Sequence, residues 1–327
     1  MLRILLVFII GVLFIAAIMS SVKAQLGDYL TMDPRQARFI YDDIHTFVNA
    51  HKRLTPGCDS LAILQTEYLD KGTPGLKMFI EKYDLTTERL VKAIRKYPEK
   101  YATVGDLPIL IAAEEPSYRE AFAELKRLIP NAIFPRTYFL VAGHRGIGSG
   151  SLEGQLMSVE KWVRPIAKDK KASLVHELVH FQQAMAVGYE KYTALFGREK
   201  SLLGLTIREG TAEFFAHLAT GIVPKEETLV YAKKHERRLW EWFQKEMHGS
   251  ETKEWMWSCP RDPDQPRDVG YEIGYLIVES YYNNAKDKRQ AVREILGVTD
   301  YQAFLERSGY AEKFEKEQMS RRSHRVI

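Results

Sequence analysis

The sequence predicts a predominantly helical α+β fold. Apolar residues recur at helical spacing over most of the chain. Two short runs near the middle are rich in β-branched and aromatic residues, as is typical of strands. The composition is that of a globular protein, because 45% of the 327 residues are hydrophobic and 28% are charged.

The first 24 residues have the layout of a secretory signal peptide. Arg3 precedes an apolar run from Ile4 to Met19, and Val22 and Ala24 occupy the positions that a signal peptidase reads. We therefore predict cleavage after Ala24 and a secreted or periplasmic protein. The alternative is that the segment stays uncleaved and anchors the chain in a membrane.

A helical N-terminal region is expected over residues 25–130. The stretch 33–54 is predicted to be one helix, because its apolar residues follow helical spacing, Asp33 is a candidate N-cap and Pro34 takes the first helical position. Three further stretches have the same spacing: 76–84, 86–101 and 117–129.

Two strands are predicted next, separated by a loop. Residues 137–143 and 155–162 form the strand-like runs, and the eleven residues 144–154 between them are rich in glycine. The loop lacks the GxxxxGK[ST] pattern of a phosphate-binding loop, so we expect a plain connection.

The remainder of the chain is predicted to be helical. The expected helices are 169–188, 201–221, 225–249, 270–285, 287–296 and 300–310. Gly188 and Gly221 are expected to end the first two of these helices. The charged residues 316–327 form a tail.

The helix expected over 169–188 carries two histidines around a glutamate, in the segment HELVH. His176 and His180 are four residues apart, so a helix projects both imidazoles to one side, where one Zn2+ ion can accept both. Glu177 lies beside that face, where it can hold the attacking water and act as the general base.

The next helix supplies candidates for the third ligand that a catalytic zinc site requires. Glu209 lies 29 positions after His180, which leaves enough chain for a connection and an antiparallel helix. Glu213 lies one turn further on the same face, where it can support a ligand histidine. His217 continues the spacing and is a competing ligand. Because this helix is strongly apolar, its carboxylates require partners.

The segment HELVH followed by EGTAEF resembles the gluzincin group of zinc metallopeptidases, which includes thermolysin-like and aminopeptidase-like families. The resemblance implies that Glu209 is the third ligand and that Glu213 supports His176. The chain is more similar still to largely uncharacterised bacterial families of predicted zinc-dependent proteases, with their strand pair before the metal helix and late GY-x-x-GYLIV segment. We therefore expect a zinc metallopeptidase-like domain with a thermolysin-like core over residues 131–315.

The late segment PRDVGYEIGYLIVESYY supplies candidates for stabilising the oxyanion of a tetrahedral intermediate. Tyr271 and Tyr275 are four residues apart on one helix face, and Arg267 precedes them. Gluzincins often use a tyrosine in this role, so the resemblance favours Tyr271 or Tyr275. The alternative is that both tyrosines are core residues with bonded hydroxyls.

Aminopeptidase activity is not supported, because the GSLEGQLMSVE segment lacks the GxMEN motif of those families. An edge strand beside the metal helix could still bind an extended peptide, which favours an endopeptidase.

Four tryptophans lie between positions 240 and 257 and are expected to belong to the hydrophobic core and to a lid over it. The alternative is that they form a wall of a substrate-binding site. Cys58 and Cys259 could pair or remain separate thiols.

The combined prediction is a secreted zinc hydrolase that acts on peptide or protein substrates. Binding of nucleic acid is not expected, because the net charge is only +4 and the basic residues form no stripe. Contact with a membrane is expected only if the N-terminal segment is retained. The alternative is a metallopeptidase-like protein with a binding or envelope-assembly role and little or no turnover.

Overall fold

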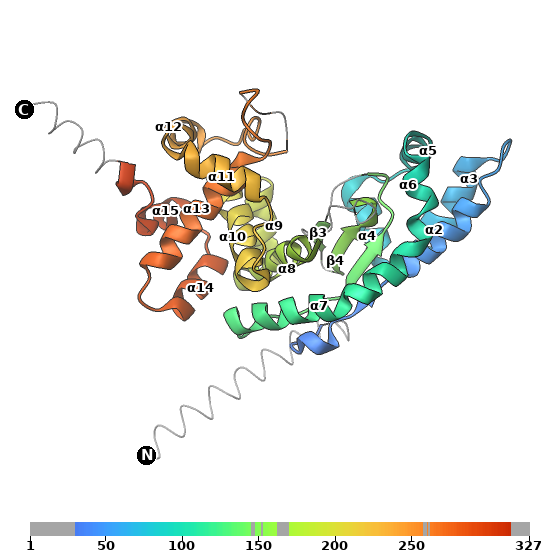
Figure 1. Ribbon diagram of the computed structural model, residues 1–327, viewed down its shortest axis with the longest axis horizontal. Coiled ribbons are helices and arrows are strands. Elements are labelled where there is room, and N and C mark those ends of the chain that lie inside the picture. The colour runs from blue at the N-terminus through green and yellow to red at the C-terminus, as the bar shows by residue number, and fades with distance from the viewer. Residues whose placement is uncertain are drawn as a thin grey trace, which may run out of the picture. The chain divides into compact units, whose positions relative to one another are not determined.

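The computed structural model confirms a predominantly helical α+β protein with a small sheet (Figure 1). The residues that it describes are 30–144, 148–151, 153–161, 170–257, 260 and 262–314. The predicted signal peptide and the tail 316–327 lie outside this part of the chain.

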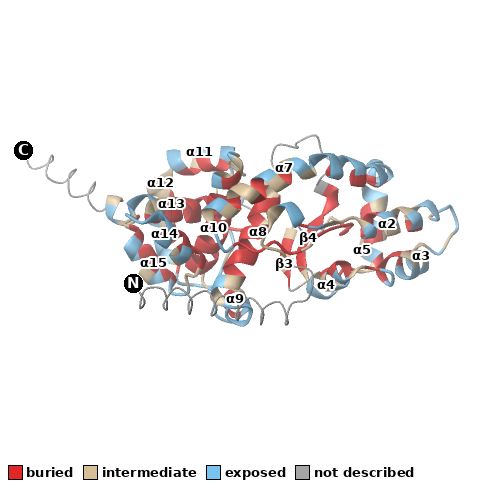
Figure 2. Cartoon of the chain, turned by 90° about the horizontal axis from the view of Figure 1, so that it is seen from below, coloured by how far each residue is buried: buried red, intermediate tan, exposed pale blue. Residues whose placement is uncertain are grey.

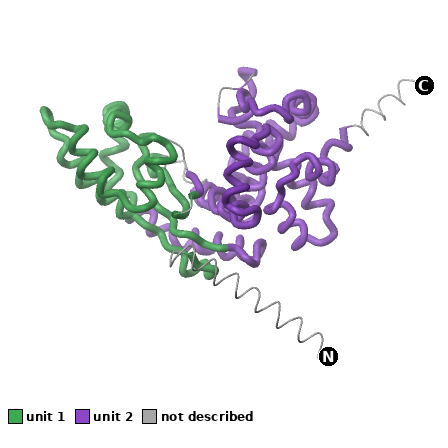
Figure 3. Tube along the Cα trace, turned by 180° about the vertical axis from the view of Figure 1, so that it is seen from behind, with its two compact units in different colours: residues 1–108, 133–146, 151–160 green, residues 109–132, 147–150, 161–327 purple. Residues whose placement is uncertain are grey.

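The chain divides into two compact units that alternate along the sequence (Figure 3). Unit 1 consists of residues 1–108, 133–146 and 151–160, and unit 2 of 109–132, 147–150 and 161–327. Among the described residues, no helix is both long and apolar enough to cross a membrane.

A four-stranded sheet has the order β1-β2-β4-β3. Three of its strands are in unit 1 and run parallel: β1 (Phe39–Ile40), β2 (Thr137–Leu140) and β4 (Gly154–Ser158). The predicted strands at 137–143 and 155–162 are thus confirmed in their main parts. Part of the expected loop is instead strand β3 (Gly148–Ser151).

The prediction of one helix over 33–54 is wrong. Asp33 does cap a helical turn, but this is only the 3-10 helix η2 (Pro34–Gln36), after which Ala37 is extended with φ −55° and ψ 135°. Phe39 then pairs with Thr137 of β2, and α2 (Asp42–Lys52) starts afterwards. Tertiary strand pairing here outweighs helical spacing.

The other helical elements of unit 1 pack around aromatic side chains, including Phe47, Tyr68 and Tyr101. They are α3 (Ser60–Leu64), the π-helical turn η3 (Gln65–Leu69), α4 (Pro74–Tyr83), α5 (Thr87–Lys96), α6 (Pro98–Ala102) and η4 (Val104–Asp106). A short η5 (Val159–Lys161) follows β4. It contains Glu160, a buried carboxylate of unit 1.

Among the described residues, unit 2 contains helices, the segments that connect them and the first residues of β3. Helix α7 (Leu107–Leu128) enters it at residue 109, and the remaining helices are α8 (Lys170–Val187), α9 (Tyr189–Phe196), α10 (Leu202–Thr220), α11 (Glu226–Lys234), α12 (Glu236–Glu246), α13 (Val269–Asn284), α14 (Lys288–Leu296) and α15 (Tyr301–Ser308). The single helix expected over 225–249 is interrupted at His235, which has φ −111° and ψ 18°.

Helix α10 is the centre of unit 2 and lies between α8 and α13, with nearly all of its residues buried (Figure 2). Two glycines bring its backbone against that of α13. A Cβ on Gly210 would lie 2.0 Å from the carbonyl carbon of Gly274, and a Cβ on Gly274 would lie 1.8 Å from the oxygen of Thr206. Only glycine permits this approach, which holds the start of α13 close to the acidic residues of α10.

Candidate metal centre

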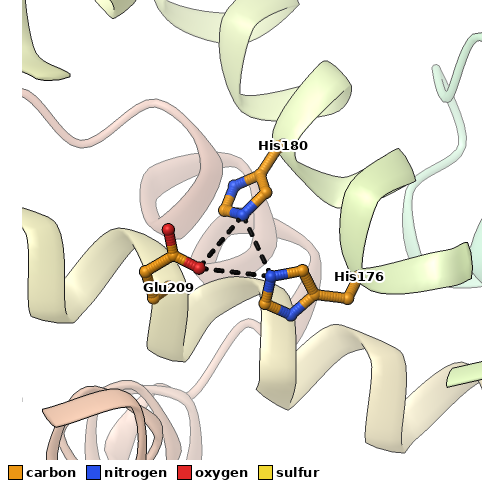
Figure 4. A group of neighbouring side chains, drawn as sticks. All are labelled: His176, His180 and Glu209. Atoms are coloured by element: carbon orange, nitrogen blue, oxygen red, sulfur yellow. Dashed lines mark hydrogen bonds and ion pairs between the residues drawn. The ribbon is translucent and has the colours of Figure 1, made fainter. Parts of the chain in front are cut away.

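His176 and His180 project from one face of α8 towards Glu209 on α10 (Figure 4). The Nε2 atoms of the histidines are 3.1 Å apart. Glu209 Oε2 lies 3.2 Å from Nε2 of His176 and 3.3 Å from Nε2 of His180. Three ligand atoms from two helices therefore meet at one point, as a tetrahedral cation requires of its protein ligands.

The expected glycines end both helices, and a serine that the sequence analysis did not single out caps the start of α10. Ser201 caps α10 by accepting a hydrogen bond from Gly204 N, and Gly221 ends it in the left-handed conformation with φ 68°. Helix α8 ends before Gly188, which has φ 91°. These limits give both helices the length needed to carry their ligand residues side by side.

The other ring nitrogen of each histidine also faces a buried acceptor. Glu213 Oε1 lies 3.5 Å from Nδ1 of His176, the histidine that the sequence analysis expected it to support. Nδ1 of His180 lies 2.8 Å from Oε1 of Gln183. An N–H donated from Nδ1 in each case leaves Nε2 as the free lone pair, which is the atom that faces Glu209.

Gln183 was missed by the sequence analysis, although a buried glutamine one turn after a ligand histidine could have drawn attention to it. Its Nε2 donates to the carbonyl oxygen of Arg208 at 3.0 Å. One amide therefore fixes the ring of His180 and ties α8 to α10 beside Glu209.

The electrostatics of this group favour a bound cation. Burial alone would lower the pKa of His176, but the charge of Glu213 and the hydrogen bond to Glu209 raise this pKa to about 9. Burial would raise the pKa of Glu209, but the charge of His180 and the hydrogen bond with His176 hold it well below its ordinary value. Without a cation, the carboxylates therefore favour the protonated form of His176. The donor set and its charge fit Zn2+.

Glu177 lies on α8 beside the two histidines, and its side chain is half-buried. The backbone of β3 runs against it, since a Cβ on Gly148 would lie 2.4 Å from Cγ and 2.9 Å from Oε1 of Glu177. Gly148 therefore leaves the space that the side chain of Glu177 occupies. The sequence analysis had assigned Gly148 to an ordinary loop.

The two candidate tyrosines of α13 have different surroundings. The ring of Tyr271 lies 6.2 Å from that of His176, with an interplanar angle of 23°. The hydroxyl of Tyr275 instead lies 2.7 Å from Nδ1 of His217. Tyr271 is therefore the tyrosine beside His176, whereas Tyr275 and the competing candidate His217 pair with each other.

Helix α13 carries a further buried acid, Glu272, that the sequence analysis missed. Burial, reinforced by the charge of Glu213, raises the pKa of Glu272 to about 8. Lys225 offsets part of the negative charge, because its Nζ lies 3.5 Å from Oε1 of Glu213. The apolar surroundings of Glu272 in GYEIGYLIV were the available signal.

The tryptophan cluster divides into core and exposed members. Trp240 and Trp255 are buried, as expected of core residues. Trp257 is 52% exposed, and its indole N–H donates to the hydroxyl of Tyr271 at 2.7 Å.

Cys58 is a free thiol among the described residues, and Cys259 lies outside them.

Residues 137–299 match the model of the family described as Predicted Zn-dependent protease (DUF2268). This part of the chain is similar to that family. The matched segment includes every residue of the metal centre and Tyr271. No curated protein and no solved structure matches the chain. The family description implies zinc dependence, which agrees with the ligand geometry.

Proposed function

We propose that the protein is a zinc-dependent peptidase with a thermolysin-like arrangement of catalytic groups. The observation that carries the proposal is the convergence of Nε2 of His176, Nε2 of His180 and Oε2 of Glu209 within 3.3 Å of one another. Three protein ligands leave a fourth position for water, which distinguishes a catalytic zinc site from a closed structural one.

A zinc ion in such a site acts as a Lewis acid and lowers the pKa of water. Glu177 provides the general base, because it lies beside the ligand face of α8 and is only half-buried. Tyr271, stacked near His176, provides a hydroxyl that can donate to the oxygen of the scissile carbonyl. Hydrolysis of a peptide bond needs these three groups together.

The position of β3 supports an extended peptide as the substrate. This strand is the last in the sheet order, and Gly148 lies directly against Glu177. A peptide that lies alongside such a strand passes the general base in an extended conformation. This mode holds internal segments of a chain and favours endopeptidase activity. We also propose that the protein acts after secretion, and mature protein that begins at Gln25 would support this.

The decisive experiment compares Glu177→Gln with the wild-type protein on an unfolded protein substrate. We expect turnover to fall by roughly 1,000-fold or more, because the base is removed while the ligands stay. Zinc content, measured by mass spectrometry, is expected to remain at one per chain. Glu190 is an exposed residue on α9, so Glu190→Gln is the matched control and is expected to retain full turnover.

A wild-type protein that binds zinc without hydrolysing any peptide would contradict the proposal and favour the binding role. Equal activity of Glu177→Gln and wild type would exclude the proposed mechanism.

A further inference from the structure

Trp257 is held in an unusual conformation directly beside Tyr271. Its backbone has φ 60°, and its backbone N–H donates to Oδ1 of Asp268 at 2.6 Å. Asp268 itself has φ 64° and precedes α13, the helix that carries Tyr271. Two residues other than glycine in the left-handed region cost free energy, which their interactions must offset.

The packing of Trp257 does not explain this conformation. With 52% of its surface exposed, its indole removes little apolar area from water compared with the buried Trp255. Among the described residues, the side chain donates a hydrogen bond from its Nε1 to the hydroxyl oxygen of Tyr271. The conformation, held by the backbone bond to Asp268, directs the indole N–H to that oxygen.

The chemistry of the two groups fixes the direction of this bond. An indole N–H can only donate, so the phenolic oxygen of Tyr271 must accept. The hydroxyl hydrogen is then left to donate elsewhere. The ring itself contacts His176, 6.2 Å away between ring centroids, and Lys225, whose Nζ lies 3.3 Å from the ring centroid. Tyr271 thus has its ring and its oxygen held by different neighbours.

We propose that Trp257 is a positioning residue, which orients the O–H of Tyr271 for donation to the carbonyl oxygen of the substrate. The proposal rests on the proposed peptidase function and deepens it by assigning a role to an exposed residue outside the HExxH motif. A donor that is oriented before the substrate binds stabilises the transition state more than one that must reorient.

The hydrogen bond can be tested in the metal-free protein by NMR of the five tryptophan indole N–H groups. The Trp257 signal is assigned by its absence from Trp257→Phe. We expect this signal to shift in Tyr271→Phe, because the acceptor is lost, and to stay unchanged in Tyr275→Phe, whose hydroxyl bonds His217 instead. An unchanged signal in Tyr271→Phe would overturn the proposal.

The catalytic consequence is tested with the zinc-loaded protein. Trp257→Phe is expected to lower kcat roughly 10- to 100-fold and to leave KM and zinc content unchanged. The loss should not exceed the loss caused by removing an oxyanion donor completely. In the Tyr271→Phe background the same substitution is expected to have no further effect on kcat. Trp242→Phe on α12 is the control for loss of an indole and should keep the wild-type kcat.

The possible failures are distinguishable. Independent, multiplying losses in the double variant, or a rise in KM with kcat unchanged, would show that Trp257 does not act through Tyr271. A wild-type protein without turnover would instead overturn the peptidase function, and the positioning role with it.

Discussion

Two buried carboxylates in this protein, Glu160 in unit 1 and Glu209 in unit 2, have opposite surroundings. Glu160 accepts hydrogen bonds from the backbone N–H groups of Ala142 and His144 and from the hydroxyls of Tyr101 and Ser158. Its oxygens are thus satisfied by neutral donors of the protein itself. Glu209 instead faces two imidazole nitrogens that also face each other at 3.1 Å.

The difference separates a carboxylate that neutral donors satisfy from one that is a candidate metal ligand. Neutral donors converge on Glu160 from several directions, and each bond is complete without an added ion. Around Glu209, its own Oε2 and the Nε2 atoms of the two histidines point at a common centre. In the protonation state that binds a metal, each of these atoms is an acceptor. Such an arrangement is stabilised only by protons or by a cation. Both carboxylates are buried, so burial alone does not distinguish them.

The largest expected effect separates these two sites directly. Glu209→Gln is expected to purify without stoichiometric zinc and to lose turnover, because one of three ligands becomes neutral and weakly binding. Glu160→Gln is expected to keep its zinc but to lose about 1–3 kcal/mol of stability, since an amide cannot accept from all four donors. Metal analysis and chemical denaturation of both variants check this. Retention of zinc by Glu209→Gln would place the third ligand elsewhere.

The next prediction concerns the space occupied by Glu177. In Gly148→Ala the new methyl group overlaps the side chain of Glu177, which must move. We expect kcat to fall roughly 100-fold, as for a displacement of about 1 Å in a catalytic group, while zinc content stays at one per chain. Gly150→Ala on the same strand is the control, because a Cβ there meets no atom within 4 Å. Equal losses in both variants would indicate a general disturbance of β3.

A smaller effect is expected from the support of His180. Gln183→Leu removes both the acceptor for its Nδ1 and the tie to Arg208, so we expect zinc affinity to fall roughly 10- to 100-fold. Competition with a chromophoric chelator measures this. Gln182→Leu removes a neighbouring buried amide that donates to Leu178 O, and it is expected to leave zinc affinity unchanged. Similar losses in the two variants would show that the effect is one of helix packing.

The smallest effect concerns Glu272, a buried acid whose pKa burial and Glu213 raise to about 8. Between pH 5 and 8, the folded protein keeps a proton on this group that the unfolded chain has released, so stability falls as pH rises through this window. Glu272→Gln cannot titrate. We therefore expect its Tm, relative to wild type, to increase from pH 5.5 to pH 8 in metal-free protein.

Calorimetry at the two pH values measures this difference in Tm. The exposed Glu227→Gln on α11 is the control and should show no such trend. A constant difference between Glu272→Gln and wild type at both pH values would contradict a raised pKa of Glu272.

The sequence predicted the convergence of the three candidate ligand side chains better than the N-terminal fold. His176, His180 and Glu209 were identifiable because fixed spacing on a helix determines which side chains share a face. The long helix over 33–54 was wrong, because pairing of Phe39 with a strand almost 100 residues later leaves no mark in local spacing. Long-range contacts of this kind decide between helix and strand where the local pattern permits both.

The groups around the ligands show the same limit. Glu213 could be predicted from its spacing to Glu209, whereas Gln183 and Gly148 act through contacts between elements that only the folded chain brings together. Tyr271 and Tyr275 were equivalent by spacing. Their different neighbours, His176 and His217, separate them only in the structure.

The central claim is that one zinc ion is held by two imidazoles and one carboxylate from α8 and α10. Anomalous diffraction at the zinc edge, on crystals of the zinc-loaded protein, tests it most directly. We predict one strong peak per chain, about 2.0–2.2 Å from Nε2 of His176, Nε2 of His180 and a carboxylate oxygen of Glu209. A peak elsewhere, or none at this position, would contradict the account.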